Sequence, residues 1–197
     1  MKQPTLAIFA NFFIDNKERL QRMKDSFDSF KEANPNQWVI NIRGSLKFQA
    51  GEFLKQEIGE KLQLFYFQSK KGWQHDSNII ASKIFANYVL YWIEDHILII
   101  SPTTLNNIVA EMSEFNVDQF WYSWFKSDVR NRFAIIEPYK VGKNITVRKL
   151  DSDACLKIRK KLGKDFYIIA SPSIMSRGFF IKVISSRKPY LKRWPLD

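Results

Sequence analysis

The chain of 197 residues contains a single cysteine, Cys155, and only two histidines, His75 and His96. One cysteine excludes an internal disulfide framework and a cysteine-based zinc site, and two histidines without a third partner motif do not make a zinc site of their own. The sequence also lacks the run of roughly 20 uncharged apolar residues that a transmembrane helix needs. Its N-terminal stretch leads to no small-residue cleavage site, so no signal peptide is expected. We therefore expect a soluble, cytoplasmic protein.

Acidic residues are scarce in the second half of the chain. Residues 141–197 hold 14 lysines and arginines against 4 aspartates and glutamates, whereas residues 1–140 hold 17 against 16, so most of the net charge of +11 lies near the C-terminus. Such a surface suits nucleic acid, phospholipid headgroups or a phosphate-bearing substrate, although a solvated lysine-rich face has the same composition. With 45% hydrophobic residues the chain is nonetheless able to bury the core of one domain.

The first hundred residues alternate between apolar runs and amphipathic stretches. Expected strands cover residues 5–13, 37–42, 62–68 and 88–93, and expected helices begin at Asp15, near residue 48 and near Asn78. This alternation is typical of a mostly parallel α/β sheet whose strands are buried on both faces. In such sheets ligands bind at the carboxyl ends of the strands.

The pattern changes after residue 100. A helix is expected from Ser101-Pro102, followed by an antiparallel hairpin of residues 119–125 and 132–137, a strand at 144–150, a helix at 151–162 and a strand at 166–170. We interpret the chain as one domain with an α/β half (1–100), a smaller, partly antiparallel half (101–186) and a basic tail (187–197).

Three titratable residues, Glu94, Asp95 and His96, interrupt the apolar run YVLYWIEDHILII at residues 88–100. Adjacent carboxylates repel one another unless a cation lies between them and a phosphate, and Mg²⁺ or Mn²⁺ commonly shares carboxylate and phosphate oxygens. An exposed turn whose charges face water is the alternative interpretation.

Four short segments resemble the motifs of GT-A-fold glycosyltransferases, the large family that includes cellulose and hyaluronan synthases. They are residues 8–11 (IFAN), 43–45 (RGS), 76–78 (DSN) and 88–95 (YVLYWIED). The segment 173–177 (SIMSR) resembles the strand and helix on the acceptor side of the same family. The resemblance implies a GT-A-like fold with a nucleotide-binding sheet. The size and style of the chain also resemble those of a glycosyltransferase of an icosahedral archaeal virus, which would place it in the host cytoplasm.

The resemblance further implies a nucleoside-diphosphate sugar as donor, a divalent metal (Mn²⁺ or Mg²⁺) on its diphosphate, and an acceptor that is a protein, a glycan or a lipid. Asp95 falls on the metal-binding last aspartate of the family motif, and the first aspartate falls on Ile93 or, with a one-residue slide, on Glu94, which would then share the metal. The donor-binding positions fall on a set of four further residues: Ala10, Asn11, Arg43 and Asn78. The family's uracil-reading aspartate is replaced here by Ile42 or Arg43, and its late Glu-Asp pair has no clear counterpart.

The only literal Asp-x-Asp of the chain is at Asp151 and Asp153, where a helix is expected to begin. Aspartate at this place commonly caps free backbone N–H groups. The resemblance implies an inverting reaction in which a carboxylate deprotonates the acceptor hydroxyl, and Asp151 is our candidate for that general base. Glu137 and Asp128 are the reserves.

Other functions fit parts of the sequence. The charge surplus suits a basic nucleic-acid-binding protein or a metal-dependent nuclease that uses the same carboxylates, although no nucleic-acid motif is visible. A scaffold that has kept the fold and lost catalysis is a third possibility. The basic C-terminal part also suits contact with a membrane surface.

Overall fold

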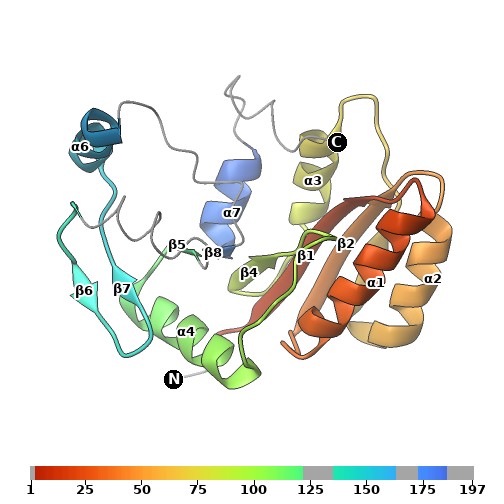
Figure 1. The fold of residues 1–197 in the computed structure, drawn as a ribbon, viewed down its shortest axis with the longest axis horizontal. Helices are drawn as coiled ribbons and strands as arrows, with labels where there is room; N and C mark the ends of the chain where they lie inside the picture. The colour runs from red at the N-terminus through yellow and green to blue at the C-terminus, as the bar shows by residue number, and fades with distance from the viewer. Residues whose placement is uncertain (1–2, 122–134, 163–172, 186–197) are drawn as a thin grey trace.

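The computed structural model describes residues 3–121, 135–162 and 173–185. Its larger sheet contains six strands in the order β3-β2-β1-β4-β8-β5 (Figure 1). These strands are β1 (Leu6–Phe13), β2 (Gln37–Arg43), β3 (Leu62–Phe65), β4 (Tyr88–Tyr91), β5 (Gln119–Trp121) and β8 (Ser173–Ser176). The described helices are α1 (Lys17–Lys31), α2 (Lys47–Ile58) with the 3₁₀ turn η1 (Gly59–Lys61), α3 (Trp73–Ala81), α4 (Pro102–Phe115), α6 (Ser152–Leu162) and α7 (Arg177–Ile184).

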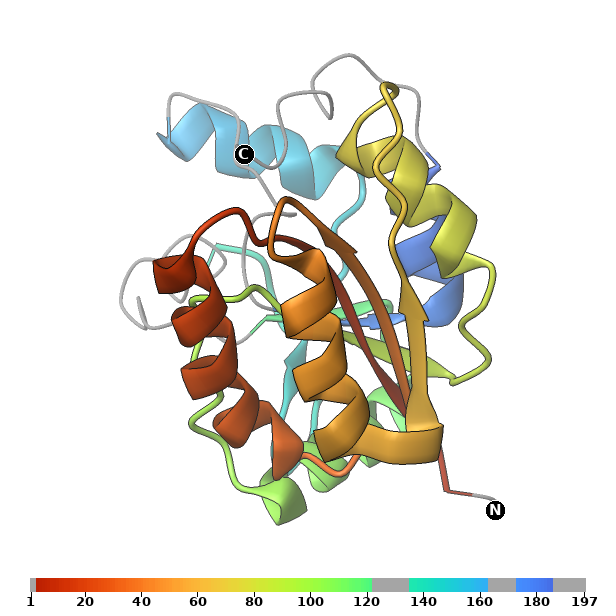
Figure 2. The same cartoon turned by 90° about the vertical axis from the view of Figure 1, so that its right-hand side faces the viewer.

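Strands β1 to β4 pair in parallel, as the alternating sequence predicted. Helices α1 and α2 cover one face of this sheet, and α3 and α7 cover the other (Figure 2). Because both faces are covered, β1 and β2 are buried along nearly their whole length, which explains their continuous apolar sequences.

Alternate residues of β1 enter two different cores. Ile8 and Ala10 pack with the residues of α1 and α2, whereas Ala7 and Phe9 pack with those of α3 and α7. By this alternation the next residue, Asn11, lies on the α3 side of the sheet. The buried amide of Asn11 therefore borders the apolar core that Ala7 and Phe9 form with α3 and α7.

The second half of the chain adds the antiparallel strands. β8 lies between β4 and β5 and runs antiparallel to both. A separate hairpin pairs β6 (Lys140–Val141) with β7 (Thr146–Val147). The smaller antiparallel element predicted for this half is therefore present. The expected strand at 166–170 and most of the expected hairpin at 119–137 fall outside the described residues.

Several predicted boundaries were wrong. β4 ends at Tyr91 rather than at residue 93, and α3 begins at Trp73, five residues before Asn78. The N-cap of α1 is Asn16 and not Asp15, because the Asn16 side chain accepts the hydrogen bond from the backbone N–H of Arg19. In the described part of the chain, no helix has the length and apolar character needed to cross a bilayer.

Candidate functional site

Polar side chains gather at the carboxyl edge of the parallel strands. The register of β1 and β2 sets Asn11 opposite Asn41, and Phe13 opposite Arg43. All three polar residues are buried, with Asn41 completely inaccessible and Asn11 only 7% exposed. Buried polar groups are stable only where they are hydrogen-bonded, so the network around them decides their role.

Asn11 is the centre of that network. Its Oδ1 accepts hydrogen bonds from Asn41 Nδ2 (2.9 Å) and Arg43 Nε (3.2 Å), and its Nδ2 donates to Ser77 Oγ on α3 (2.8 Å). Asn41 in turn bonds both backbone groups of Phe67, donating to its carbonyl (2.9 Å) and accepting from its N–H (2.7 Å). Strands β1 and β2, the segment after β3 and helix α3 are thereby held in one rigid polar arrangement, which we call the edge network (Asn11, Asn41, Arg43 and Ser77).

Helix α3 adds a carboxylate next to the edge network. Asp76 is 1% exposed, and its Oδ2 accepts a hydrogen bond from the backbone N–H of Ser69 (3.1 Å). Its Oδ1 is buried and has no hydrogen-bond partner among the residues that the structure describes. A buried carboxylate oxygen without a partner carries an uncompensated desolvation cost, which a donor from a ligand would remove.

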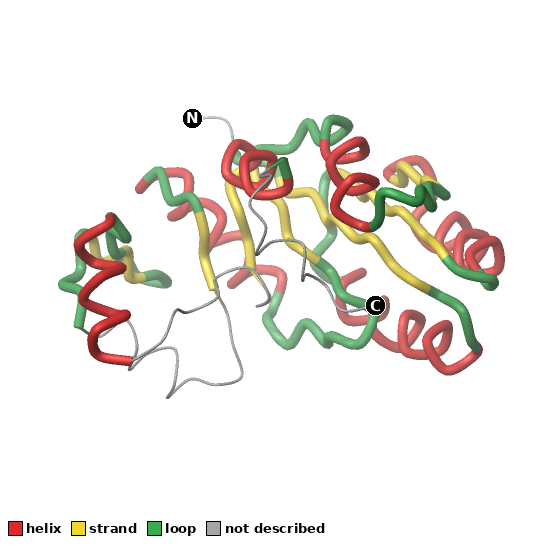
Figure 3. The backbone as a smooth tube through the Cα atoms, turned by 90° about the horizontal axis from the view of Figure 1, so that it is seen from above, coloured by secondary structure: helices red, strands yellow, loops and turns green. Residues whose placement is uncertain are grey.

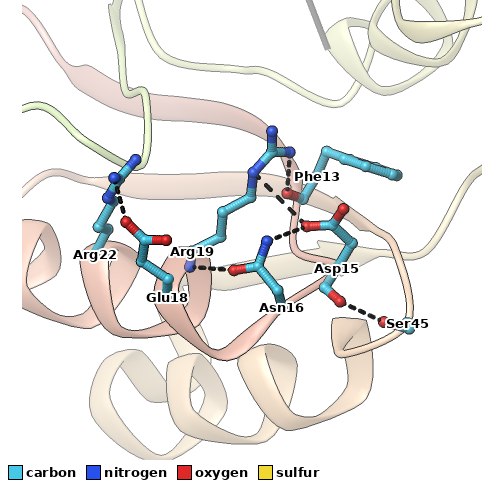
Figure 4. Close-up of polar contacts among 7 residues, drawn as sticks. All are labelled: Phe13, Asp15, Asn16, Glu18, Arg19, Arg22 and Ser45. Carbon is cyan, nitrogen blue, oxygen red and sulfur yellow. Dashed lines mark hydrogen bonds and ion pairs between the residues drawn. The ribbon is translucent and has the colours of Figure 1, made fainter.

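Two arginines, one in the first turn of α1 and one at the end of β2, carry positive charge at this edge of the sheet. The guanidinium groups of Arg19 and Arg43 each lie 5.4 Å from the centre of the Phe13 ring, and Arg19 Nη1 also donates to the Phe13 carbonyl (Figure 4). The loops after β1 and β2 are tied together by Ser45 Oγ, which donates to the Asp15 carbonyl at 2.8 Å. Cations beside an aromatic ring at a strand edge suit an anionic ligand with a flat group.

Gly44 explains the tight path of the second loop. Its φ of +94° lies in the left-handed region, and a Cβ at this position would stand 2.4 Å from the carbonyl oxygen of Ile14. The glycine of the predicted Gly-Ser motif is therefore required by backbone geometry.

Glu94 and Asp95 form a turn just beyond β4, at the same edge of the sheet. Trp92, fully buried, anchors this turn because its Nε1 donates to Ser26 Oγ (2.8 Å), while the Ser26 hydroxyl donates to the carbonyl of His96. The Asp95 side chain is 54% exposed, 3.7 Å from His96 Nε2.

The turn fits only part of a metal site. Within the described ranges 3–121, 135–162 and 173–185, no three His, Cys, Asp or Glu side chains cluster as ligands. Asp95 with Glu94 does, however, match the one or two carboxylates by which Mg²⁺ is usually held when substrate phosphates complete its shell.

The remaining predicted residues lie apart from the edge network. Ala10 faces the core with α1 and α2, so only its backbone borders the strand edge. Asn78 is exposed and accepts a hydrogen bond from the Ser185 hydroxyl (2.9 Å). Asp151 caps α6, accepting the N–H of Ala154 (2.8 Å), and α6 lies at the end of the molecule away from α1 and α2 (Figures 1 and 3).

The reserve candidates add little. Glu137 is exposed in the segment before β6, and Asp128 falls outside the described residues. Sequence reasoning missed Asn41, Asp76 and Ser77. Asn41 left a signal, because it is a lone amide within the apolar strand QWVINIR.

No protein-family model and no curated protein sequence matches the chain. Among solved structures it is similar to the mannosyltransferase PcManGT from Pyrobaculum calidifontis, determined in complex with GDP-Man and Mn²⁺, with a TM-score of 0.51 and 14% identity over 66% of this chain and 38% of that one. It is also similar to residues 1–349 of S. aureus TarS, with a TM-score of 0.51 and 12% identity over 88% of this chain and 47% of that one. The chain thus spans less than half the length of either structure. At such low identity the likeness shows the fold alone, and that fold is GT-A-like, as the sequence predicted.

Proposed function

We propose that the chain is a glycosyltransferase that moves a sugar from a nucleoside-diphosphate sugar to an acceptor hydroxyl. The observation that carries the proposal is the edge network, a set of buried and mutually oriented polar side chains at the carboxyl edge of a GT-A-like sheet. Ligands of open α/β sheets bind at this edge. The similarity to PcManGT, whose structure holds GDP-Man and Mn²⁺, supports a donor of this class.

The nucleotide would lie against the loops after β1 and β2. Arg19 and Arg43 supply positive charge beside the Phe13 ring, and the unpartnered Oδ1 of Asp76 offers an acceptor for a nucleobase N–H. Ala10 would take part through its backbone only. The exposed Asn78 lies on α3, the helix that carries Asp76, and would reach the donor only from its solvent side.

Asp95, assisted by Glu94, would hold Mn²⁺ or Mg²⁺ against the diphosphate. The ion, when bound, offsets the negative charge that develops on the leaving diphosphate. The protein's own contribution is to fix the turn: the anchored Trp92 keeps Asp95 at the strand edge while its carboxylate stays open to solvent.

The transfer needs a base on the acceptor side. As the acceptor oxygen bonds to the anomeric carbon, the bond from that carbon to the diphosphate oxygen breaks, and a carboxylate takes the hydroxyl proton. We assign this role to Asp151, with Glu137 as the reserve. The acceptor itself is a protein, a glycan or a lipid.

Calorimetric titration with GDP- and UDP-sugars, with and without Mn²⁺, tests the proposal. We expect binding by the wild type that depends on Mn²⁺ and is lost in Asp95→Ala. Asp28→Ala removes a matched, exposed carboxylate of α1 and should bind like the wild type.

Asp153→Ala distinguishes the literal Asp-x-Asp from the turn after β4, and we expect its metal-dependent binding to be unchanged. Absence of binding for every sugar nucleotide, together with salt-sensitive binding to DNA or RNA, would refute the transferase and favour the nucleic-acid alternative.

A further inference from the structure

Residues 135–162 form a basic lobe at the end of the molecule opposite α1 and α2 (Figures 1 and 3). The lobe comprises the β6–β7 hairpin and α6 and carries eight lysines and arginines against three acidic residues. It uses none of the groups that bind the proposed donor.

The hairpin is attached to the body through one face. Glu111 on α4 accepts hydrogen bonds from Asn144, through both its backbone N–H (3.0 Å) and its Nδ2 (2.6 Å), and from the N–H of Ile145 (3.1 Å). Ile145 is 4% exposed and joins the main core. The attachment fixes which face of the hairpin remains outside.

That outer face is apolar as well as basic. Lys140 Nζ lies 5.2 Å from the centre of the Phe115 ring of α4 and so marks the inner side, and the next residue of the strand, Val141, points the other way. Val141 is 70% exposed and Tyr139 is 51% exposed, with Lys149 Nζ only 4.0 Å from the centre of the Tyr139 ring. Lys143 is exposed at the turn of the hairpin.

Helix α6 also exposes apolar and basic side chains together. Ile158 is buried in the small core that it shares with Ile136. Leu156 lies on the opposite face of the helix at 52% exposure, and the exposed Lys160 follows it one turn later.

We propose that the basic lobe docks on an anionic lipid surface. Lysines attract acidic headgroups, and the exposed aliphatic side chains of Val141 and Leu156 enter the boundary between headgroups and acyl chains. A nucleic acid would engage the lysines but would leave Val141 and Leu156 in water, because its backbone offers only phosphate and sugar. The apolar component therefore favours lipid.

Co-sedimentation with vesicles of phosphatidylcholine, alone and mixed with phosphatidylglycerol, tests this proposal. We expect the wild type to bind only the mixed vesicles. The double variant Lys143→Glu/Lys160→Glu should bind them roughly 25-fold more weakly or worse, at about fivefold per lysine near the surface. Val141→Ser/Leu156→Ser should weaken binding about tenfold through lost apolar burial.

The matched control is Lys83→Glu/Phe85→Ser, which changes one exposed lysine and one 64% exposed aromatic residue outside the lobe and should bind like the wild type. Unchanged binding by the serine variant, or binding to duplex DNA that the serine variant retains, would overturn the proposal in favour of plain polyanion attraction. Circular dichroism of each variant ensures that a loss of binding reports on the surface and not on unfolding.

Discussion

Replacing Asn41 by alanine removes the side chain that joins β2 to β1 and to the segment after β3. Its amide donates to Asn11 and to the Phe67 carbonyl and accepts from the Phe67 N–H, at distances between 2.7 and 2.9 Å. A typical intramolecular hydrogen bond contributes about 1 kcal/mol net, so three of them predict a loss of about 3 kcal/mol in the free energy of unfolding. For a chain of this size that corresponds to a fall of about 6–12 °C in Tm.

Urea denaturation followed by tryptophan fluorescence and circular dichroism measures the loss of stability. Asn78→Ala is the matched control, because that exposed amide accepts a single hydrogen bond from Ser185, and we expect it to cost less than about 1 kcal/mol. The same preparations serve for donor titration, in which Asn41→Ala should bind the nucleotide more weakly because Asn11 loses one of the donors that orient it. A loss of stability no larger than that of the control would refute the reasoning, since it would mean that the buried amide is not the tie between β2 and the segment after β3.

Two further predictions concern the attachment of the β6–β7 hairpin to α4 and the N-terminus of α1. Burial pushes the pKa of Glu111 upward, but the hydrogen bonds from Asn144 and the N–H of Ile145 outweigh it and hold the pKa below its ordinary value of 4.5. The resulting stabilisation is complete above that value and is lost as the pH falls through the lower pKa of the folded state, so below pH 4.5 the wild type should lose Tm more steeply than Glu111→Gln. Asn16→Ala should lower the free energy of unfolding by about 1 kcal/mol in urea melts, and Asp15→Ala by clearly less, because only Asn16 caps α1.

The parallel sheet could be predicted because each of its long strands has a continuous apolar sequence. A strand buried on both faces must be apolar throughout, and β1 and β2 are. The start of α3 could not be found in this way, since its first turn contains Trp73 and Asp76, whose burial depends on the sheet edge opposite them and not on any helical spacing of aliphatic residues. At α1, Asp15 and Asn16 are equally good capping residues, and only the path of the chain after β1 decides between them.

Only some residues of the candidate site leave a signal in the sequence, and each of them does so singly. Asn11, Arg43 and Asp95 stand at the ends of apolar runs, where a polar side chain attracts attention. Ser77 does not, because its hydrogen bond to Asn11 follows from the packing of α3 on the sheet, and neither does Asp76, whose burial follows from the same packing. Which side chains from separate elements meet at the sheet edge depends on strand register and helix packing. Neither can be predicted from a local sequence pattern.

The composition of the edge network is itself an argument for a ligand. Apolar side chains at positions 11 and 41 would continue the core formed by Phe9 and Val39 and would avoid the cost of burying two amides. The chain instead keeps the two amides hydrogen-bonded to each other and Asn11 to Arg43, together with a carboxylate on α3 whose Oδ1 has no partner in the described part of the chain. Departures from local consistency concentrate where a protein binds or reacts. Because the network is oriented before any ligand arrives, a nucleotide that satisfies the free oxygen of Asp76 would meet fixed partners and lose little free energy in ordering them.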